Sequence, residues 1–597
     1  MLLIGAIGPS RPTDVTASPN WAAKLDPTLQ RGDGAGRSRI ILRSASATAL
    51  VSTERLAQEL GARVVRRLPF GRSVALDVPN GALPALASSP LVDRVSSDRV
   101  VAGAMERTGP TVGATYVRQT LGYDGGGIGV AIIDSGVTSW HDDLADADGE
   151  QRVSQFVDFI NGAEAPYDDY GHGTHVAGII AGNGHDSSGA RSGIAPGAHL
   201  VALKVLDAAG NGHVSDVIAA LDYAVQHKNE LNIRVINVSV AGGVYESYMT
   251  DPLTLAAKRA VDAGIVVVAA AGNNGRGPRG TPQYAGVTSP GNAPWVLTVG
   301  ASSHMGTIDR SDDTMAAFSS RGPGAIDYHA KPDLVAPGVG IESLSNPASL
   351  MYSIDGPYLL SGTIATSYLP YLSLTGTSMS APVVAGTVAL MLQANDSLTP
   401  NAVKAILQYT AQIYPGYDAL TEGAGFLNAR GAVELARYVD NPGTYAYPAT
   451  DGWSGRIIWG NHTASGGRLT ADATAWSTAV TWGDGLAPDG RRITWGVKCG
   501  LLGCATVTSQ AWQTSCVDVL CSVLDGDLLA YPNIVWGNLC GGKDCPGIPW
   551  TARDVTATSD PDADTVVWGT SDGDGDTVVW GTSCRDPSCR PVLWGRQ

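Results

Sequence analysis

One stretch of small and apolar residues constrains the fold of this chain more than any other. It opens with Gly376-Thr377-Ser378-Met379-Ser380-Ala381-Pro382 and continues as an apolar run from Val383 to Ala394. Small side chains let a helix pack closely against its neighbours, and Pro382 suits an early helical turn, where its missing N–H is not needed. The stretch therefore predicts a buried helix with Ser378 at its N-terminus, where free N–H groups and the helix dipole favour an oxyanion.

A serine hydroxyl becomes a nucleophile only when a base takes its proton. Candidates for that base and for an orienting carboxylate lie upstream. Residues 130–136, Val-Ala-Ile-Ile-Asp-Ser-Gly, predict a buried strand that ends at Asp134, and residues 171–178, Gly-His-Gly-Thr-His-Val-Ala-Gly, open a second small-residue helix at His172. Sites in open α/β sheets form at the carboxyl ends of strands. Asp134, His172 and Ser378 are therefore the candidate catalytic residues.

Residues 105–440 alternate between strand and helix patterns, as a parallel sheet with helices on both faces requires. Continuous runs rich in Val and Ile indicate strands that are buried on both faces. The predicted strands are residues 128–134, 199–206, 235–240, 265–271 and 295–299, and the predicted helices are residues 172–181, 214–228, 253–263, 378–394, 400–410 and 429–438.

The three motifs, in the chain order Asp134, His172, Ser378, resemble the subtilisin-like serine proteases, or subtilases. Residues 266–273, Val-Val-Val-Ala-Ala-Ala-Gly-Asn, are similar to the strand whose terminal asparagine, here Asn273, donates its amide to the oxyanion. The resemblance extends over about residues 105–440. It implies an acyl-enzyme mechanism in which His172 takes the Ser378 proton, Asp134 orients His172, and no cofactor is required for the chemistry.

The resemblance also implies that a protein or peptide substrate lies extended against two edges of the sheet. These edges are Gly210-Asn211-Gly212 and Ser239-Val240-Ala241-Gly242. The second edge departs from the Ser-Leu-Gly-Gly that is usual in the family. The methyl group of Ala241 would narrow the primary specificity pocket, so the sequence does not predict which substrate side chain the pocket accepts. Residues 344–373 are longer than the family core needs. We expect a surface loop near the site there, which serves either substrate selection or packing.

A structural calcium ion is a further implication of the resemblance. Asp143, nine residues after Asp134, matches a calcium ligand of the family, but the loop Asn183 to Arg191 that should supply the other ligands differs in length and sequence. Calcium at Asp143 is therefore left open. A zinc site at His172 and His175 is disfavoured, because these histidines are three residues apart rather than four and lack the glutamate of the metalloprotease helix.

The N-terminal part divides in two. Residues 1–38, without periodicity, predict a flexible leader, and residues 39–104 predict a small α+β unit. This unit resembles the subtilase propeptide, which aids folding and then inhibits the enzyme, so self-cleavage is expected near residues 100–107; an unrelated α+β domain is the alternative. The first eight residues lack the basic start and long apolar core of a secretory signal. They are either the remnant of one, or the true start lies upstream.

Residues 441–597 have a different composition and predict a β-rich segment, because eleven of the 14 tryptophans and all 8 cysteines lie there. Trp-Gly pairs recur, usually after a β-branched run, and the octapeptide Asp-Thr-Val-Val-Trp-Gly-Thr-Ser occurs twice, starting at Asp564 and Asp576. Each pair predicts a short strand that ends in a turn. The tryptophans form either a binding face for a polysaccharide or a cell surface, or the core of a small β domain.

The cysteines follow a strict pattern, Trp-x-x-x-Cys-x-x-x-x-Cys, which occurs four times. Constant spacing favours four local disulfides that clip hairpins and implies an oxidising compartment. Two four-cysteine zinc sites are the alternative. The expected pairs are Cys499 with Cys504, Cys516 with Cys521, Cys540 with Cys545, and Cys584 with Cys589.

Charge and hydropathy exclude two classes of partner. A net charge of -16 argues against nucleic acid, and no stretch approaches the about 18 uninterrupted apolar residues of a membrane span. The sequence therefore predicts a secreted, self-processed serine endopeptidase of subtilisin-like α/β fold, with its own propeptide as inhibitor. The alternative is a surface-binding protein with an inactive protease-like scaffold, whose function is carried by the C-terminal repeats.

Overall fold

The structure, a computed structural model, describes most of the chain up to residue 511 and one strand beyond it. The described residues are 21–26, 29, 36–68, 72–98, 105–276, 282–414, 416–460, 462–483, 485–500, 503–508, 510–511 and 577–579. They form two compact units, Met1–Val101 and Ala102–Gln597.

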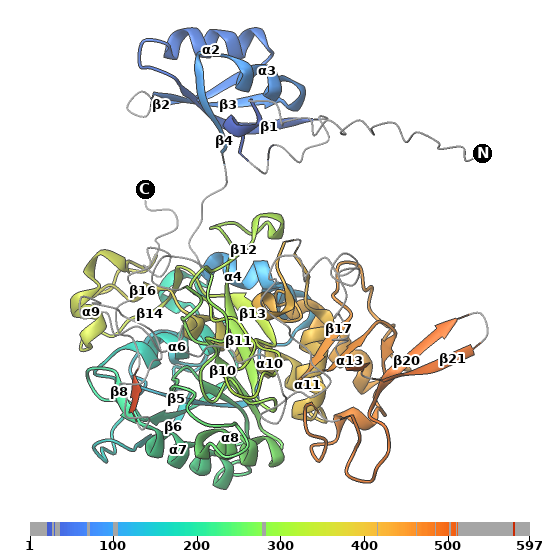
Figure 1. Cartoon of the computed structure of the whole chain (residues 1–597). Helices are drawn as coiled ribbons and strands as arrows, with labels where there is room; N and C mark the ends of the chain where they lie inside the picture. The colour runs from blue at the N-terminus through green and yellow to red at the C-terminus, as the bar shows by residue number, and fades with distance from the viewer. Residues whose placement is uncertain are drawn as a thin grey trace, which may run out of the picture. The chain divides into compact units, whose positions relative to one another are not determined.

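The first unit is an antiparallel sheet with two helices, α2 and α3, on one face (Figure 1). Ile40 and Leu42 of β1 alternate with exposed residues and are fully buried, which is the pattern of a strand with one covered face. The sheet order is β2-β3-β1-β4. The elements are β1 (Arg37–Ser44), α2 (Leu50–Glu59), β2 (Arg63–Leu68), β3 (Ser73–Pro79), η3 (Asn80–Ala82), α3 (Leu83–Ser88) and β4 (Val92–Ser97). The expected small α+β unit is confirmed.

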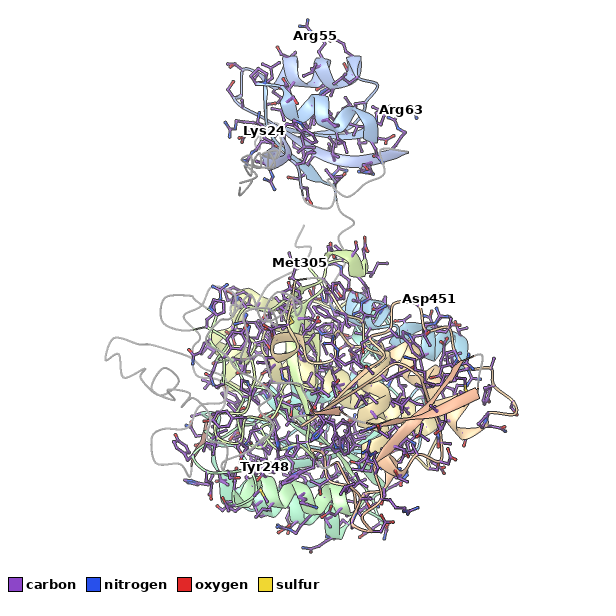
Figure 2. All side chains as sticks on the ribbon, turned by 45° about the vertical axis from the view of Figure 1, so that its right-hand side comes forward. Lys24, Arg55, Arg63, Tyr248, Met305 and Asp451 are labelled. Atoms are coloured by element: carbon purple, nitrogen blue, oxygen red, sulfur yellow. A yellow bond between two sulfur atoms is a disulfide. The ribbon has the colours of Figure 1, made fainter. Side chains whose placement is uncertain are left out.

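Part of the expected leader packs on this unit. The turn η1 (Ala22–Lys24) is held by Lys24, labelled in Figure 2, whose Nζ donates to the carbonyl oxygens of Ser89 at 3.0 Å and Val92 at 2.8 Å. Leu25, which follows, is buried and forms a bridge with Val95 of β4. The unit therefore begins before residue 39.

An eight-stranded sheet organises the second unit. Its order is β12-β11-β10-β9-β5-β7-β6, with β13 also paired to β11, and all of these pairs are parallel except β11 with β12. The strands are β5 (Gly129–Asp134), β6 (Val153–Asp158), β7 (His199–Lys204), β9 (Ile233–Val238), β10 (Val266–Ala270), β11 (Leu297–Ser303), β12 (Thr314–Met315) and β13 (Leu334–Pro337). Every residue of β5 and β10 is buried, as their uninterrupted apolar sequences predict. The predicted parallel α/β fold is confirmed.

Helices pack on this sheet and on one another. α10 lies against β9, β10 and β11 and contacts α6 and α13, whereas α7 and α8 pack together. The helices are α4 (Met105–Val112), α5 (Ala114–Tyr116), η4 (Val117–Leu121), η5 (Asp142–Leu144), α6 (His172–Ala181), η6 (His185–Ser187), α7 (Val214–Gln226), α8 (Pro252–Asp262), η7 (Arg310–Asp312), α9 (Leu350–Ile354), η8 (Gly356–Tyr358), α10 (Thr377–Ala394), α11 (Pro400–Thr410), α12 (Ala419–Glu422), α13 (Ala429–Asp440) and η9 (Thr474–Trp476). Among the described residues only α10 has the length and apolarity of a membrane span, and 89% of it is buried in the protein.

The long segment between β13 and α10 is ordered. β14 (Ile341–Leu344), β15 (Leu359–Leu360) and β16 (Tyr371–Leu374) form a small antiparallel sheet, and α9 lies between β14 and β15. Backbone N–H groups of α9 donate to the turn that leads into α6: Leu350 to Asp169 at 2.8 Å and Met351 to Tyr170 at 3.0 Å. This segment is therefore attached directly to the start of α6.

Residues 457–495 continue the same core. Trp459, Trp476, Trp482 and Trp495 are buried and form one cluster of tilted and edge-to-face ring contacts, with ring centroids 3.9 Å apart for Trp459 and Trp482. They pack against α11, where Trp482 donates its Nε1–H to Asn401 Oδ1 at 2.7 Å. The strands are β17 (Arg456–Trp459), β18 (His462–Ser465), β19 (Arg468–Leu469), β20 (Thr494–Gly500), β21 (Gly503–Thr508), β22 (Gln510–Ala511) and β23 (Thr577–Val579).

Among the three Trp-Gly pairs in the described residues, the prediction that each pair ends a strand holds only at Trp459. Trp482 lies in a turn, and Trp495 is the second residue of β20. The position of each ring is set by its packing in the tryptophan cluster against α11 and not by the strand in which it lies. A disulfide joins Cys499 and Cys504 across the β20–β21 hairpin. The other six cysteines lie outside the described residues.

Candidate active site

Two of the four candidate residues lie at or just after the carboxyl ends of strands of the main sheet, and the other two lie at the starts of helices. Asp134 is the last residue of β5, and Asn273 lies three residues after β10. His172 is the first residue of α6 and Ser378 is the second residue of α10. β5, β9 and β10 are adjacent in the sheet, so the parallel arrangement gathers these residues at one edge.

Asp134 and His172 form a buried pair. His172 Nδ1 lies 2.7 Å from Asp134 Oδ1 and 2.9 Å from Oδ2, and neither side chain is exposed. Burial lowers the pKa of His172 well below its ordinary value and raises the pKa of Asp134. The N–H of Ser135, which donates to Asp134 Oδ1 at 2.7 Å, and the charge of Lys204 oppose the rise for Asp134. A neutral imidazole, the form that accepts a proton, is therefore favoured.

A second buried carboxylate, Asp168, holds the start of α6. Its Oδ1 accepts hydrogen bonds from Ser135 Oγ at 2.8 Å and from the Gly171 N–H at 2.7 Å, and its Oδ2 accepts from the Thr174 N–H at 2.8 Å. Ser135 Oγ in turn accepts the Gly173 N–H at 2.9 Å. Asp168 thereby ties the α6 turn to the end of β5. Sequence reasoning missed this residue, although an aspartate just before a small-residue helix is a capping signal.

Pro382 and Ser239 together fix the backbone of Ser378. A proline cannot donate the helix bond to the carbonyl four residues before it, so the Ser378 carbonyl lacks that bond. Ser239 Oγ donates to this carbonyl at 3.0 Å, and Ser378 Oγ donates to the Ser239 carbonyl at 3.2 Å. Ser239 opens the second predicted substrate edge, so the structure brings this edge beside the candidate nucleophile.

Asn273 is oriented by Thr377. Its Oδ1 accepts from the Thr377 N–H and from Thr377 Oγ1, both at 3.0 Å, whereas its buried Nδ2 has no hydrogen-bond partner among the described residues. A Cβ atom built at Gly376 would lie 3.5 Å from Asn273 Nδ2 and 3.7 Å from the Ser378 nitrogen. The two N–H donors therefore face one small space beside Gly376, as stabilisation of an oxyanion requires.

Replacing Gly376 with alanine is expected to lower kcat/KM about 100-fold or more, because the methyl group would occupy this space and losing one oxyanion donor already costs about 10²–10³ in rate. Gly376 has φ 168°, an extended conformation that alanine also adopts, so the melting temperature should not change. Gly485→Ala is the matched control, since nothing lies within 4 Å of its added Cβ. Equal activity of the two variants would show that the space beside Gly376 is not part of the active site.

The remaining residues of the predicted substrate edges lie on two separate backbones. Asn211 and Gly212 belong to the short strand β8 (Asn211–His213), and Gly210 directly precedes it. Val240 and Ala241 are buried, and Gly242 exchanges two backbone hydrogen bonds with Ser289, at 2.9 and 3.0 Å.

Asp143 lies in a buried group of side chains that could hold a metal ion. Its Oδ1 accepts the Asp186 N–H at 2.8 Å and its Oδ2 accepts the Tyr371 hydroxyl at 2.9 Å. Ligand atoms of His141, Asp143 and Asp186 lie within 4.8 Å of one another. Asp186 is 1% exposed and neither of its carboxylate oxygens accepts a hydrogen bond in the described part of the chain. His185 Nδ1, 3.5 Å from Asp186 Oδ1, is the nearest basic atom in this part of the structure. A buried carboxylate beside His141 and Asp143 fits a bound cation.

His175 serves the structure rather than a metal. Its Nε2 lies 3.1 Å from the Ile341 carbonyl and 3.0 Å from the Leu372 carbonyl, on two strands of the small antiparallel sheet. Burial lowers the pKa of His175 to about 3. The residue therefore links α6 to β14 and β16 as a neutral ring.

Comparison with known proteins gives consistent matches over this unit. Residues 125–435 match the family described as the subtilase family. The chain is 40% identical over 321 residues to serine protease AprX of Bacillus subtilis (strain 168), covering 53% of this chain and 67% of that protein. It is 32% identical over 382 residues to subtilisin E of the same organism, covering 63% and 84%. It is also 32% identical over 349 residues to the extracellular serine proteinase of Thermus sp. (strain Rt41A), covering 57% and 71%.

Proposed function

This chain belongs to the subtilase family and is a serine endopeptidase, and on that premise we propose that Asp134, His172 and Ser378 are its catalytic triad, with Asn273 as oxyanion donor. We further propose that the enzyme is made as a precursor, removes its own N-terminal unit and acts outside the cell. Its substrates are proteins or peptides, and its chemistry needs no cofactor.

In this mechanism His172 takes the proton of Ser378 through Nε2 while Ser378 Oγ attacks the peptide carbonyl. The oxyanion lies between Asn273 Nδ2 and the Ser378 N–H. Asp134 holds the imidazole through Nδ1 and stabilises the imidazolium. His172 then gives its proton to the leaving amine, and a water molecule hydrolyses the acyl-enzyme by the same steps.

The observation that carries this proposal is the space beside Gly376. Two N–H donors face it, one from Asn273 and one from the candidate nucleophile Ser378. The orientation of Asn273 by Thr377 leaves its amide unpaired among the described residues at the place where negative charge would develop. A scaffold that had lost its activity has no physical reason to keep an unpaired buried donor, which costs about 1–3 kcal/mol.

The test compares the full chain with its Ser378→Ala variant by intact mass and N-terminal sequencing, together with hydrolysis of casein. We expect the wild type to be cut near residues 100–107 and to hydrolyse casein, and the variant to stay whole. If both proteins stay whole and neither hydrolyses casein, the triad assignment is wrong. If the wild type hydrolyses casein but its own chain is not cut, the proposed self-processing is wrong and the proposed protease activity stands.

Asp134→Asn is expected to move the acid limb of kcat/KM to lower pH. Activity is lost as pH falls through the pKa of His172, because a protonated imidazole cannot accept the Ser378 proton. Burial lowers this pKa, and the Asp134 carboxylate, 2.7 Å away, opposes that shift. In the variant burial acts unopposed, and the rate at neutral pH should fall about 10⁴-fold. A pH–rate profile measures both effects; an acid limb at unchanged or higher pH contradicts the assignment.

Two observations support an extracellular site of action. Disulfides persist in oxidising compartments, and Cys499 and Cys504 are joined by one. A relative is itself named as an extracellular proteinase. Trp459, Trp476, Trp482 and Trp495 are buried in the core, so any binding of a polysaccharide or cell surface by the C-terminal segment would use other tryptophans, such as the half-buried Trp453.

We also propose a structural divalent cation at His141, Asp143 and Asp186. Calcium prefers six to eight oxygen ligands, whereas this group offers an imidazole nitrogen and two carboxylates, one of which already accepts two hydrogen bonds. His141 Nδ1 accepts the Asp143 N–H at 3.2 Å and its Nε2 lies 3.3 Å from the Pro370 carbonyl, so one of these contacts must give way to a metal. The mixed nitrogen and oxygen donor set fits zinc better than calcium.

The Asp186→Asn variant distinguishes the metal-bound state of this site from its metal-free state. A free metal concentration of about 100 times the Kd adds about 2.7 kcal/mol to the free energy of unfolding. With the metal present, the wild type should therefore melt several degrees above the variant. With a chelator the order should reverse, because the variant lacks the buried carboxylate of Asp186, whose oxygens accept no hydrogen bond in the described part of the chain. Metal analysis and melting curves measure this; the same order under both conditions, with no bound metal, contradicts the site.

A further inference from the structure

The short strand β8 pairs with a strand from the far end of the sequence. β23 runs antiparallel to β8, and in the described part of the chain it is the only strand in the same sheet. Figure 1 places β23, in red, directly beside β8. The register pairs are Thr577 with His213, Val578 with Gly212, and Val579 with Asn211.

β8 is a preformed edge with one side already in use. Asp207 donates its N–H to the Asn211 carbonyl at 2.8 Å, and Asp207 Oδ1 accepts the Asn211 N–H at 2.9 Å. The N–H and C=O of Asn211 therefore both face Asp207. Because these groups alternate along a strand, those of Gly212 face the opposite side, where β23 lies. Val578, the register partner of Gly212, is then the residue expected to exchange hydrogen bonds with it.

Glycine is required at the centre of this edge. A Cβ atom on Gly212 would lie 2.0 Å from the Val205 carbonyl oxygen, so β8 lies directly on the chain that continues from β7. β7 in turn pairs with β5, with Lys204 opposite Asp134. The position of β8 relative to the candidate triad is therefore held by the main sheet and does not depend on β23.

We propose that the strand Thr577–Val579 is a ligand of the chain's own substrate edge and competes there with substrate. This inference rests on the proposed function, which assigns Gly210-Asn211-Gly212 to an extended substrate. One side of a strand pairs with one partner at a time, so β23 and a substrate exclude each other. The contact makes the C-terminal segment an internal, reversible inhibitor of the enzyme.

The sequence of the segment suits this role. Thr577, Val578 and Val579 are β-branched and favour an extended strand, and strand addition uses backbone groups that any sequence offers. These three residues belong to the octapeptide Asp-Thr-Val-Val-Trp-Gly-Thr-Ser that starts at Asp576, and an identical octapeptide starts at Asp564, outside the described residues. Two identical copies give either one the same means of pairing with β8, so a test must change both.

The expected strength of the inhibition is modest. A pairing of three residues is weak between separate molecules, but a tethered strand acts at an effective concentration of about millimolar. Competition of this kind raises KM and leaves kcat unchanged. We expect its removal to lower KM for a short peptide substrate about twofold to tenfold.

Proline substitutions provide a matched pair of variants of the full chain. Val566→Pro with Val578→Pro removes, in both copies, the N–H that faces Gly212. Val567→Pro with Val579→Pro is the control, because those N–H groups face away and proline is tolerated on the open side of an edge strand. kcat and KM are measured with a chromogenic peptide. Hydrogen exchange at Gly212 is measured in the same variants carrying Ser378→Ala, which prevents self-cleavage.

The inference predicts a lower KM and faster exchange at Gly212 for the first double variant only. Equal KM values and equal exchange rates in the two double variants would overturn it. If none of the proteins hydrolyses peptide but exchange at Gly212 still differs, the strand contact stands and the proposed protease function fails. The two conclusions are therefore tested separately.

Discussion

Ser378→Ala is expected to lower kcat about 10⁶-fold, and Asn273→Ala only about 10²–10³-fold, with the fold of both variants unchanged. The difference has a structural reason. Without the hydroxyl no acyl-enzyme forms, and His172 and Asp134 then have no nucleophile to serve. Without the Asn273 amide the Ser378 N–H still faces the space beside Gly376, so part of the oxyanion stabilisation remains. Steady-state kinetics with one peptide substrate, on mature enzyme, measures both values.

Ser380→Ala is the matched control on the same helix. Ser380 lies two residues after Ser378, is equally buried, and its Oγ has no hydrogen-bond partner among the described residues. Its removal should leave kcat within about threefold of wild type, because losing an unpaired buried hydroxyl is nearly neutral. Comparable losses in the Ser380, Asn273 and Ser378 variants would point to damage of α10 rather than to loss of chemistry.

The parts of the fold that could be predicted from sequence carry their signals locally. Strand β5 is a continuous apolar run that ends in an aspartate, and α10 is a long run of small and apolar residues. Burial on both faces leaves no other arrangement for such segments than the centre of a layered α/β unit. The candidate triad was predictable for the same reason, since each of its members stands at the end of one such element.

Contacts between distant segments could not be predicted. Asp168 has its effect through Ser135, 33 residues away, and a single acidic residue before a helix has many alternative roles. Asp186 lies in a loop that departs from the family pattern, and only its burial beside His141 and Asp143 marks it as a candidate metal ligand. The roles of two glycines depend only on the space around them: Gly376 borders the two proposed oxyanion donors, and Gly212 lies against the Val205 carbonyl.

The Trp-Gly residues show the same limit most clearly. Their strand-like surroundings predict a separate β segment, yet Ile457, Trp459 and Trp495 belong to the same hydrophobic core as β5 and α10. Lys404 of α11 lies 4.4 Å from the centre of the Trp482 ring, and Gln408 of α11 accepts the Ile458 N–H. A tryptophan can pack on its own hairpin or on a helix of the catalytic unit. The outcome depends on the surface of that helix, which cannot be inferred from the residues around the tryptophan.

Trp459→Ala is therefore expected to lower the free energy of unfolding of the whole catalytic unit by about 3–5 kcal/mol, the cost of truncating a large core side chain. Trp459 is 0% exposed, and its ring contacts Trp482 at a tilt and Trp495 edge to face. Trp140→Ala is the matched control: Trp140 is 47% exposed, so its loss should cost less than about 1 kcal/mol. Urea unfolding of both variants in the Ser378→Ala background measures this without self-digestion.

The shape of the unfolding curve decides how the C-terminal residues relate to catalysis. If residues 456–500 form part of one cooperative core, Trp459→Ala shifts a single transition, and peptide hydrolysis in the active background is lost at the same urea concentration as structure. If they form an independent domain, an early transition separates from the rest and hydrolysis survives it. The buried contacts of Trp459 and Trp482 with α11 favour the first result, because α11 packs in turn against β10, the strand that leads to Asn273.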